Sequence, residues 1–309
     1  MKLVFCGTPQ FAVPTLEALI QTHEIALVVT QPDRPQGRGL ELAAAPVKQT
    51  AQKHGFRIEQ PDKIKNNAEF RALLESIAAD AVIVVGYGRI IPPWMLTLPK
   101  YGNINLHGSL LPKYRGAAPI QWAIANGERV SGVTTMLLNA GLDTGDILLQ
   151  RELGIEPDET AITYGRRLAE IGADLMIETL RSVEKGAITP RPQDHNRASL
   201  APILRKADGS ADFSLPAEVI YNRLRGFQPW PGCFTSFRGK KLSIAAAKPL
   251  QESQKLSSGE IFVEGDRVRI GCRGGALELL EVQPEGKRKM SSGDFVRGYR
   301  PHGGERLGA

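Results

Sequence analysis

Three polar side chains capable of proton and carbonyl chemistry stand near the middle of the sequence, at Asn105, His107 and Asp143. Asn105 and His107 are two residues apart, so in a strand over residues 103–107 both project from the same face. Residues 132–138 form a second strand-like run, and the loop after it carries Asp143. Ligands of open α/β sheets bind at the carboxyl ends of strands. We therefore expect an amide, an imidazole and a carboxylate to share one pocket at that edge.

Each of these side chains also has a purely structural interpretation. Asn105 could satisfy backbone groups, His107 could be a hydrogen-bonded histidine at a strand end, and Asp143 could close an Asx turn. The Asp-Thr-Gly that begins at Asp143 is also the triplet of aspartic proteases, but that chemistry needs paired aspartates and the sequence has no second Asp-Thr-Gly. The convergence of three such residues on one sheet edge favours a catalytic site.

The strings around these residues resemble a known family. Asn-Leu-His-Gly-Ser-Leu-Leu-Pro at residues 105–112, followed by Gly-Leu-Asp-Thr-Gly-Asp at residues 141–146, is similar to the signature of formyltransferases that use 10-formyltetrahydrofolate. The resemblance implies that Asn105 donates hydrogen bonds to an oxyanion and His107 moves protons, while Asp143 fixes the imidazole tautomer and stabilises the imidazolium. A substrate amine with a pKa of about 7.7 to 8 needs no strong enzyme base, and no metal is expected.

The resemblance also implies where the formyl donor binds. Adjacent leucines after His107 would suit the apolar wall of a pocket, and a glycine-bearing loop after a strand at residues 81–85 would let a flat pterin approach the backbone. The alternative for that loop is a tight strand-to-helix turn, which needs glycine just as much. The expected folate contacts are Ser109, Leu110, Leu111 and Pro112 in the first segment and Gly86, Tyr87 and Gly88 in the second.

The elements that must position these residues alternate between strand and helix. Besides the two strands already described, we expect strands at residues 3–6, 25–30, 56–59 and 81–85 and helices at residues 11–20, 47–54, 69–78 and 159–184. This alternation predicts an α/β fold with a Rossmann-like parallel sheet. No Gly-x-Gly-x-x-Gly follows the first strand and no Gly-x-x-x-x-Gly-Lys-Ser/Thr occurs, which argues against a dehydrogenase or an NTPase.

The length of 309 residues predicts two domains. We expect a formyltransferase catalytic domain at residues 1–189, a polar, proline-bearing linker at residues 190–210, and a C-terminal domain at residues 211–309. After a helix at residues 216–227, the C-terminal domain has five short strand-like runs, at residues 233–237, 242–246, 260–263, 267–271 and 277–282. They predict a small β-barrel of the oligonucleotide-binding (OB) type.

Two further features resemble the methionyl-tRNA formyltransferases in particular. The strings at residues 227–232 and 283–290 are similar to the C-terminal domain of that family. The loop at residues 31–39, Gln-Pro-Asp-Arg-Pro-Gln-Gly-Arg-Gly, resembles an insertion that reads the tRNA acceptor arm and that formyltransferases for purines or sugars lack. On its own this loop is too rich in proline and glycine for regular structure, and it could equally be a surface excursion.

The insertion departs from the family pattern at its far end. Where the family usually has a pair of lysines, this chain has Leu40 and Glu41. Arg34 and Arg38 are therefore the better candidates for tRNA contacts in the loop, because a guanidinium makes charge-assisted hydrogen bonds with phosphate.

The net charge of +6 is unevenly distributed along the sequence. Residues 1–204 hold 21 Lys and Arg against 21 Asp and Glu, whereas residues 205–309 hold 18 against 12. A neutral front and a basic back favour a C-terminal domain that contacts a polyanion such as tRNA, although charge alone suits an ordinary soluble domain equally well. The expected tRNA contacts in this domain are Lys240, Lys241 and Lys287.

Composition also bears on location and on covalent or metal cross-links. No apolar run approaches the roughly 20 residues of a membrane helix, and the first residues show no signal-peptide pattern, so we expect a cytoplasmic protein without a membrane partner. Cys6, Cys233 and Cys272 are far apart and lack Cys-x-x-Cys or histidine-rich neighbours, so neither a disulfide nor a zinc site is expected. We also expect a monomer.

Taken along its whole length, the chain is most similar to the methionyl-tRNA formyltransferases. The resemblance implies transfer of a formyl group from 10-formyltetrahydrofolate to the α-amino group of methionyl-initiator tRNA, in support of translation initiation. One alternative is another formyltransferase of the superfamily, acting on an amino sugar or a purine intermediate; the insertion and the basic tail speak against it. A second is a non-catalytic RNA-binding protein on the same scaffold; the presence of Asn105, His107 and Asp143 together speaks against that.

Overall fold

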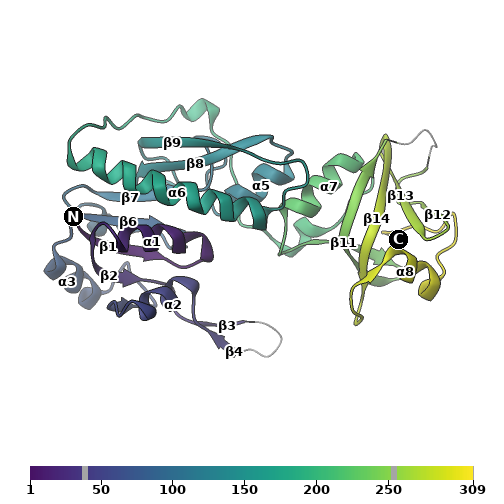
Figure 1. Cartoon of the computed structure of the whole chain (residues 1–309), viewed down its shortest axis with the longest axis horizontal. Helices are drawn as coiled ribbons and strands as arrows, with labels where there is room; N and C mark the ends of the chain where they lie inside the picture. Colours follow the sequence, from purple (N-terminus) through teal and green to yellow (C-terminus); the bar gives the residue numbers. More distant parts are fainter. Residues whose placement is uncertain (37–40, 252–255, 309) are drawn as a thin grey trace. The chain divides into compact units, whose positions relative to one another are not determined.

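The computed structural model describes residues 1–36, 41–251 and 256–308 (Figure 1). They separate into two compact units. The first unit consists of Met1–Pro119, Val130–Gly154 and Tyr164–Pro202, and the second of Ile120–Arg129, Ile155–Thr163 and Ile203–Ala309. The segment that composition indicates as a linker, residues 190–210, is thus divided at Pro202, and its first part is packed into the first unit.

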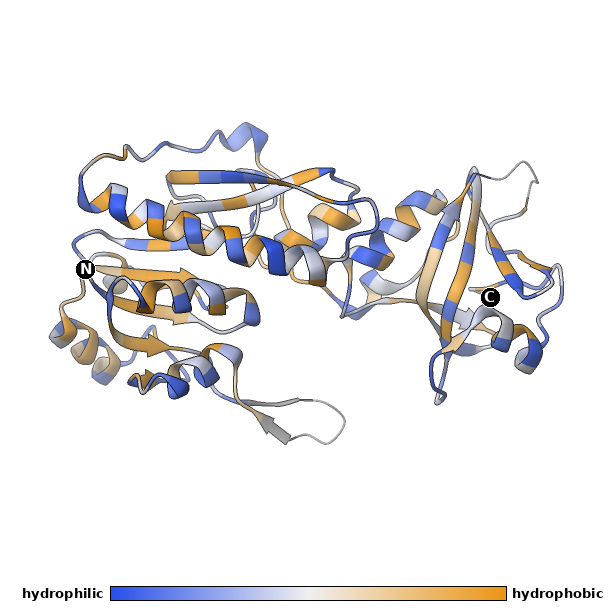
Figure 2. Cartoon of the chain, viewed as in Figure 1, coloured by the Kyte–Doolittle hydropathy of each residue, from blue (hydrophilic) through white to orange (hydrophobic). Residues whose placement is uncertain are grey.

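The first unit is built on a seven-stranded sheet, which confirms the predicted α/β class. Its strands, in spatial order, are β5 (Ile58–Glu59), β2 (Glu24–Val29), β1 (Lys2–Gly7), β6 (Ala81–Val85), β7 (Asn103–His107), β8 (Val130–Leu137) and β9 (Ile147–Gly154). β1 pairs in parallel with both β2 and β6, and β6 pairs in parallel with β7. Figure 2 shows β1, β2 and β6 as mostly hydrophobic, as strands covered on both faces must be.

The last two strands add antiparallel pairings to this parallel sheet. β8 runs antiparallel to β7, with Asn105 opposite Met136 and His107 opposite Thr134. β9, which we did not predict, runs antiparallel to β8. It lies at one edge of the sheet, and most of its side chains are only partly buried or exposed, which matches the weak apolar pattern of its sequence.

Helices cover both faces of this sheet. They are α1 (Val13–Ile20), α2 (Pro46–Lys53), α3 (Ala68–Ile77), α4 (Pro93–Leu96) and α6 (Ala161–Glu184), and the first unit also has short 3-10 turns η1 (Gln10–Ala12) and η2 (His195–Arg197). Helix α5 (Pro119–Ala125) belongs to the second unit except for its first residue. On one face Leu106 of β7 meets α6 so closely that a Cβ on Gly172 would lie 2.7 Å from its side chain. On the other face Val82 and Val84 pack with residues of α3 and α4. Since Asn105 pairs with Val84, it projects toward this second face.

The insertion also differs from the prediction, because part of it is regular. β3 (Arg34–Gln36) and β4 (Glu41–Ala43) form a two-stranded antiparallel ribbon, with Pro35 opposite Leu42. Proline is tolerated there because each strand of an isolated ribbon has one edge without a partner. Residues 37–40, which include Arg38, lie outside the described residues.

The second unit is organised around an antiparallel sheet, and the five predicted strands are confirmed. The spatial order is β10 (Cys233–Phe237), β11 (Lys240–Leu250), β14 (Gly275–Pro284), β13 (Arg267–Cys272) and β12 (Ile261–Glu264), with β15 (Met290–Ser291) beside β14. Two register shifts between β11 and β14 mark bulges, which bend and twist a sheet. Side chains of this sheet share one core with α7 (Ala217–Gly226) and α8 (Ser292–Tyr299). A further 3-10 turn, η3 (Lys206–Gly209), precedes α7. The OB type remains a prediction.

Helices long and apolar enough to cross a membrane are absent from the described parts of both units.

Candidate active site

The three predicted catalytic residues meet in the first unit. Asn105 and His107 project side by side from β7 and expose only 8% and 6% of their surface. Asp143 lies beyond β8, and its Oδ2 is 3.7 Å from His107 Nδ1. An amide, an imidazole and a carboxylate therefore share one small region, as the sequence predicts.

Asp143 reaches this region by a route that the sequence did not predict. Because β8 is antiparallel to β7, its carboxyl end, Leu137, lies opposite Ile104 near the start of β7 rather than beside His107. The expectation that both strands end at the same sheet edge is therefore wrong. The loop at residues 138–146 instead runs back toward the carboxyl end of β7, and this path brings Asp143 to His107.

The residue types of this loop follow from its tight path. Asn139 Oδ1 accepts hydrogen bonds from Gly141 N at 2.9 Å and from Thr144 Oγ1 at 2.8 Å, so Asn139 closes the local turn. A Cβ on Gly141 would lie 2.1 Å from Thr144 Oγ1, and one on Gly145 would lie 1.7 Å from the Leu137 carbonyl oxygen. Only glycine fits at either position. Asp143 itself has a left-handed backbone, with φ of 49°.

On the side of the ring away from Asp143, His107 is held by the backbone of Tyr114. Its Nε2 lies 2.8 Å from the Tyr114 carbonyl oxygen, and a carbonyl can only accept, so Nε2 carries the hydrogen. In the neutral ring Nδ1 then keeps its lone pair, on the side that faces Asp143. Asp143 Oδ2 also accepts a hydrogen bond from Gly116 N at 2.8 Å. Tyr114, rather than Asp143, fixes the tautomer, and residues 114–116 hold both the imidazole and the carboxylate.

Asn103 and Asn105 lie on the same face of β7 but differ in their hydrogen bonding. The Asn103 amide donates to the carbonyl oxygens of Met95 at 2.9 Å and Leu96 at 3.3 Å, so Asn103 serves the backbone of α4. Within the described residues, the Asn105 amide has no hydrogen-bond partner. The structural interpretation, in which an asparagine satisfies backbone groups, therefore describes Asn103 and not Asn105.

Of the segment expected to contact folate after His107, half is turned inward. Ser109 is fully buried, and its hydroxyl donates to the Lys113 carbonyl oxygen at 2.6 Å. Thr134 Oγ1 donates to the Ser109 carbonyl oxygen at 2.7 Å and accepts from Leu111 N at 3.1 Å, which pins the turn to β8. Leu111 is also buried. The partly exposed members of the segment are Leu110 and Pro112.

The second expected folate segment lies between the ends of β1 and β6. The chain proceeds outward from β1 in both directions, so this is the topological switch point where such sheets bind ligands. Gly86 and Gly88 have φ of 56° and 75°, which favours glycine. The Tyr87 side chain is only 2% exposed and packs in the core. Gln31 Nε2 donates to the carbonyl oxygens of Tyr87 at 2.9 Å and Gly88 at 3.0 Å. A ligand at this loop would meet backbone and not the tyrosine ring.

Comparison with known proteins decides the family. Residues 1–180 match the formyl transferase family, and residues 203–300 match the formyl transferase C-terminal domain. The methionyl-tRNA formyltransferase of Koribacter versatilis is 57% identical over 310 residues, an alignment that covers 100% of this chain and 99% of the relative. That of Acidobacterium capsulatum is 58% identical and covers 100% of both chains. The chain belongs to the methionyl-tRNA formyltransferase family.

Solved structures share the fold at lower identity. An N-formyltransferase from Helicobacter canadensis, in complex with folinic acid and dTDP-3-aminofucose, is 19% identical with a TM-score of 0.68, over 92% of this chain and 99% of that one. HypX from Aquifex aeolicus, in complex with tetrahydrofolic acid, is 20% identical with a TM-score of 0.64, over 96% of this chain. The match spans 47% of the HypX chain, so the two proteins share about half of the length of HypX.

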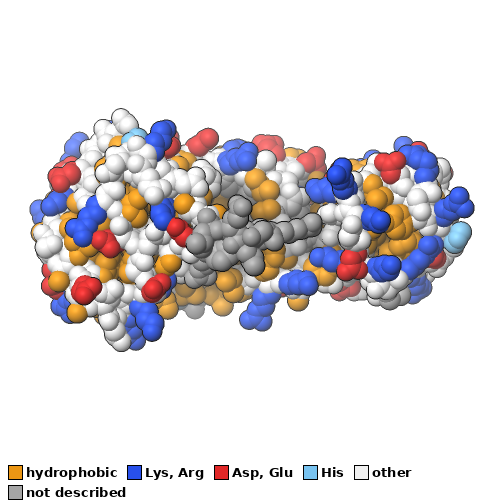
Figure 3. All heavy atoms as spheres, turned by 90° about the horizontal axis from the view of Figure 1, so that it is seen from below, with side chains coloured by type: hydrophobic (Ala, Val, Ile, Leu, Met, Phe, Trp, Pro, Cys, Tyr) orange, Lys and Arg blue, Asp and Glu red, His pale blue; other side chains and the backbone are white. Residues whose placement is uncertain are grey.

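The lysines expected to contact tRNA in this family member lie on adjoining turns of the second unit. Lys240 and Lys241 begin β11, and Lys287 follows β14. Glu285 N donates to the Lys241 carbonyl oxygen at 2.9 Å, which places the two turns side by side. All three lysines are exposed, and within the described chain none forms an ion pair. Figure 3 shows Lys and Arg side chains around a hydrophobic patch on the face of this unit that is in view.

The structure changes the charge argument, however. The first unit holds 20 Lys and Arg against 17 Asp and Glu, and the second 19 against 16. The second unit includes Ile120–Arg129 and Ile155–Thr163, which add four acidic residues and one arginine to the basic tail. The excess of +6 is thus shared equally, and the predicted contrast of a neutral front with a basic back is wrong for the folded units.

Sequence reasoning missed two buried residues that support the Asp143 loop, Arg115 and Gln193. Arg115 follows the recognised string closely, and that proximity was the only signal for it. Gln193 lies in the expected linker, where polar residues without periodicity give no sign of burial. Gln193 Nε2 donates to the carbonyl oxygens of Asp143 at 2.9 Å and Gly145 at 2.7 Å.

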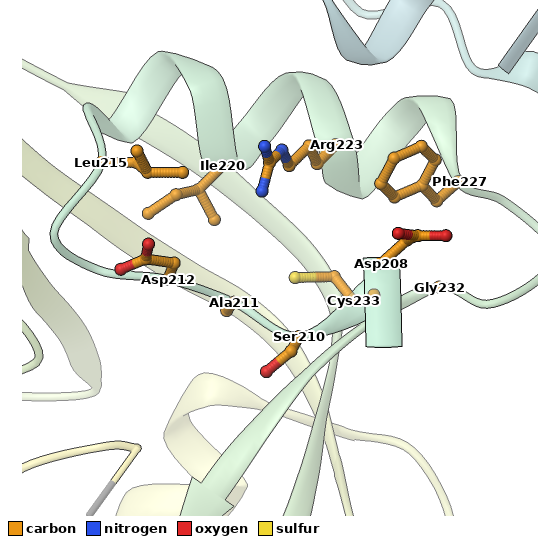
Figure 4. A pocket seen from close by; sticks show the side chains of 11 residues that line it. Asp208, Ser210, Ala211, Asp212, Leu215, Ile220, Arg223, Phe227, Gly232 and Cys233 are labelled. Atoms are coloured by element: carbon orange, nitrogen blue, oxygen red, sulfur yellow. The ribbon is translucent and has the colours of Figure 1, made fainter. Parts of the chain in front are cut away.

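A small hollow in the second unit is lined by a cysteine and by charged side chains (Figure 4). Cys233 and Arg223 both line it. Burial raises the pKa of the Cys233 thiol to about 12, so it stays protonated at neutral pH and is a poor nucleophile. Within the described residues, no group of three or more His, Cys, Asp or Glu side chains is placed to hold a metal ion.

Proposed function

We propose that this chain transfers a formyl group from 10-formyltetrahydrofolate to the free α-amino group of methionyl-initiator tRNA, in the cytoplasm, as a monomer that supports translation initiation. Its relatives of 57% and 58% identity carry the name methionyl-tRNA formyltransferase. The observation that carries the proposed site is the unpartnered Asn105 amide beside an imidazole whose Nδ1 faces Asp143. We assign the chemistry to Asn105, His107 and Asp143.

Asn105 would act as the hydrogen-bond donor. As the amine attacks, negative charge develops on the formyl oxygen, and the amide hydrogens of Asn105 can meet it. The amide needs no rearrangement for this, because it gives up no existing bond within the described residues. Removal of one such donor from comparable sites costs about 3 to 4 kcal/mol in the transition state.

His107 would carry the proton. Nδ1 can accept the proton that the amine loses and return it to the leaving nitrogen, while Nε2 stays bonded to the Tyr114 carbonyl. The imidazolium that forms would stand beside the Asp143 carboxylate, whose position is already held by Gly116 N. Asp143 would therefore stabilise the charged ring without a large movement.

The formyl donor would sit against the two predicted loops. The HypX and Helicobacter canadensis structures are complexes with folates, which supports a folate site on this shared fold. In this chain the backbone of Gly86 and Gly88 can approach a flat ring closely, and the partly exposed Leu110 and Pro112 can line an apolar wall. We propose these residues as the donor contacts. Ser109 and Leu111 would act by shaping the turn.

The tRNA would contact basic residues of both units. We propose Arg34 and Arg38 of the insertion as contacts to the acceptor arm, and Lys240, Lys241 and Lys287 as contacts to the backbone. The support is the family's insertion together with the exposure of the three lysines on adjoining turns. Phosphate neutralisation would make this part of the binding salt-dependent.

A formyl-transfer assay tests the proposal against its alternatives. Purified protein would receive labelled 10-formyltetrahydrofolate and one of three amines, namely methionyl-initiator tRNA, a nucleotide-linked amino sugar, or an amino ribonucleotide. We expect label on the methionyl-tRNA alone, and none without protein. Faster transfer to the sugar or the ribonucleotide would establish the other formyltransferase. Binding of tRNA without transfer to any amine would leave an RNA-binding protein.

A further inference from the structure

A buried pair of side chains supports the Asp143 loop from behind. Arg115 and Gln193 are 78 residues apart in sequence and expose only 7% and 6% of their surface. Gln193 Oε1 accepts from Arg115 Nε at 3.1 Å and from Nη2 at 2.6 Å. A buried guanidinium is costly to bring out of water, so its pairing indicates that the structure depends on this contact.

Both the oxygen and the nitrogen of the Gln193 amide form hydrogen bonds. Its oxygen faces the guanidinium, and its nitrogen donates to the carbonyl oxygens of Asp143 and Gly145. An inverted amide would set nitrogen against the guanidinium and oxygen against two carbonyls, so only one orientation is possible. Arg115 therefore determines how Gln193 presents its donors to the loop.

The same segment also holds the partners of the catalytic side chains. Tyr114, just before Arg115, supplies the carbonyl that binds His107, and Gly116, just after it, supplies the N–H that binds Asp143. Arg115 N donates to the Ser199 carbonyl oxygen at 2.8 Å, and its own carbonyl accepts from Ala201 N at 2.7 Å. Residues 199–201 are thus hydrogen-bonded to the backbone of Arg115, while Gln193 is hydrogen-bonded to the loop that carries Asp143.

We propose that Gln193 is a positioning residue for Asp143, and that Arg115 orients Gln193 for this role. The two donors of Gln193 hold the backbone on both sides of Thr144, where Asp143 has its left-handed conformation. This backbone sets the direction of the Asp143 carboxylate toward His107. The inference rests on the proposed function, because it assigns Gln193 a part in the reaction that Asp143 serves.

The test is a double-mutant cycle that separates positioning from stability. Gln193→Glu keeps the length and the acceptor for Arg115, but it sets a carboxylate oxygen against two carbonyls. We expect kcat for methionyl-tRNA formylation to fall roughly 10- to 100-fold, since a displacement of about 1 Å can cost that much, with KM changed less than about threefold. In an Asp143→Asn background the same substitution should lower kcat less than about twofold, because no carboxylate remains to be placed.

Two control variants keep the result interpretable. Gln193→Met removes every hydrogen bond without adding charge, and it should show the same loss and the same dependence on Asp143 if the Glu variant does not fold. Asn222→Asp is the matched control. Asn222 Oδ1 accepts from Arg225 Nε at 2.9 Å in a similarly buried pair within the second unit. We expect this variant to lower the melting temperature and to leave kcat unchanged.

The outcomes distinguish failure of this inference from failure of the proposed function. If Asp143→Asn is impaired but Gln193→Glu keeps wild-type kcat, or lowers it equally in both backgrounds, the positioning role is overturned and the function stands. If Asp143→Asn formylates methionyl-tRNA at the wild-type rate, the catalytic assignment itself fails, and the positioning role fails with it. A loss confined to the background that retains Asp143 supports the proposal.

Discussion

The proposed catalytic region of the first unit and the basic turns of the second unit are built in opposite ways. Asn105, His107 and Asp143 are largely buried, and the last two are held by backbone groups of residues 114–116. Lys240 and Lys241 are exposed at the start of β11, with long side chains and no ion pair in the described residues. The first region depends on geometry within about an ångström, and the second on charge summed over several residues. Substitutions should accordingly change kcat in one and salt-dependent affinity in the other.

The largest effect is expected from His107→Ala. Loss of the proton carrier should lower kcat roughly 100- to 10,000-fold, while tRNA affinity stays near that of the wild type. Steady-state kinetics at saturating donor and tRNA, together with a tRNA titration, measure both. A correctly folded His107→Ala protein with substantial turnover would remove His107 from the mechanism.

The two asparagines of β7 sharpen the comparison within a single strand. Asn105→Ala should lower kcat roughly 100- to 1,000-fold with little change in stability. Asn103→Ala leaves the carbonyls of Met95 and Leu96 without their donor, so it should lower the free energy of unfolding by about 1 to 3 kcal/mol and spare kcat. Kinetics and urea unfolding of both variants check this pattern. An exchange of the two effects would mean that we have assigned the wrong asparagine.

A change behind the expected folate segment should have an intermediate effect. Thr134→Val keeps the side-chain shape but removes the hydroxyl that joins Ser109 to Leu111. We expect KM for 10-formyltetrahydrofolate to rise several-fold, while KM for methionyl-tRNA changes little, because the turn would no longer be pinned. Thr135→Val, whose hydroxyl contacts Thr179 on the opposite side of β8, is the neighbouring control. Equal donor KM values for all three proteins would separate this turn from folate binding.

Substitution of the insertion should affect the use of tRNA more modestly. Arg34→Ala with Arg38→Ala removes two proposed phosphate contacts, so KM for methionyl-tRNA should rise by roughly tenfold while donor binding persists. Identical kinetic constants for the wild type and the double variant would make the insertion a surface excursion.

The smallest effect is expected from the exposed turns. Lys240→Ala with Lys241→Ala should reduce the slope of log affinity against log salt by about one for each lysine lost, with kcat unchanged. Lys289→Ala is a useful comparison, because Lys289 is 3.6 Å from Glu281 and already has an acidic partner. Titration of labelled tRNA across a salt series measures all three proteins. An unchanged slope for the double variant would exclude these lysines from the tRNA contact.

Local patterns in the sequence predicted much of the fold and the placement of Asn105 and His107. β6 and β7 have the bounds that were predicted, and the two-residue spacing correctly placed Asn105 and His107 on one face. The direction of β8 could not be predicted, because a strand buried on both faces has no pattern that depends on its partner's direction. The loop that carries Asp143 therefore reached the site by an unexpected path.

Long-range contacts account for the remaining differences. Asn103 and Asn105 are identical in type and face, and only the carbonyls of α4 distinguish their roles. Gln193 is placed by hydrogen bonds to residues about 50 positions away, which leave no periodic signal in the sequence. The predicted contrast in charge between the two units was wrong for a related reason. The acidic segment Ile155–Thr163 belongs to the second unit, although it lies within the first part of the sequence.

The most direct test of the account measures single-turnover formyl transfer to saturating methionyl-tRNA at two salt concentrations. The wild type would be compared with His107→Ala and with the Lys240→Ala, Lys241→Ala double variant. We predict that His107→Ala transfers at least roughly 100-fold more slowly at both salt concentrations, whereas the double variant transfers at the wild-type rate once tRNA saturates it. A wild-type rate for His107→Ala, or a rate for the saturated double variant as low as that of His107→Ala, would contradict the assignment of chemistry to the first unit.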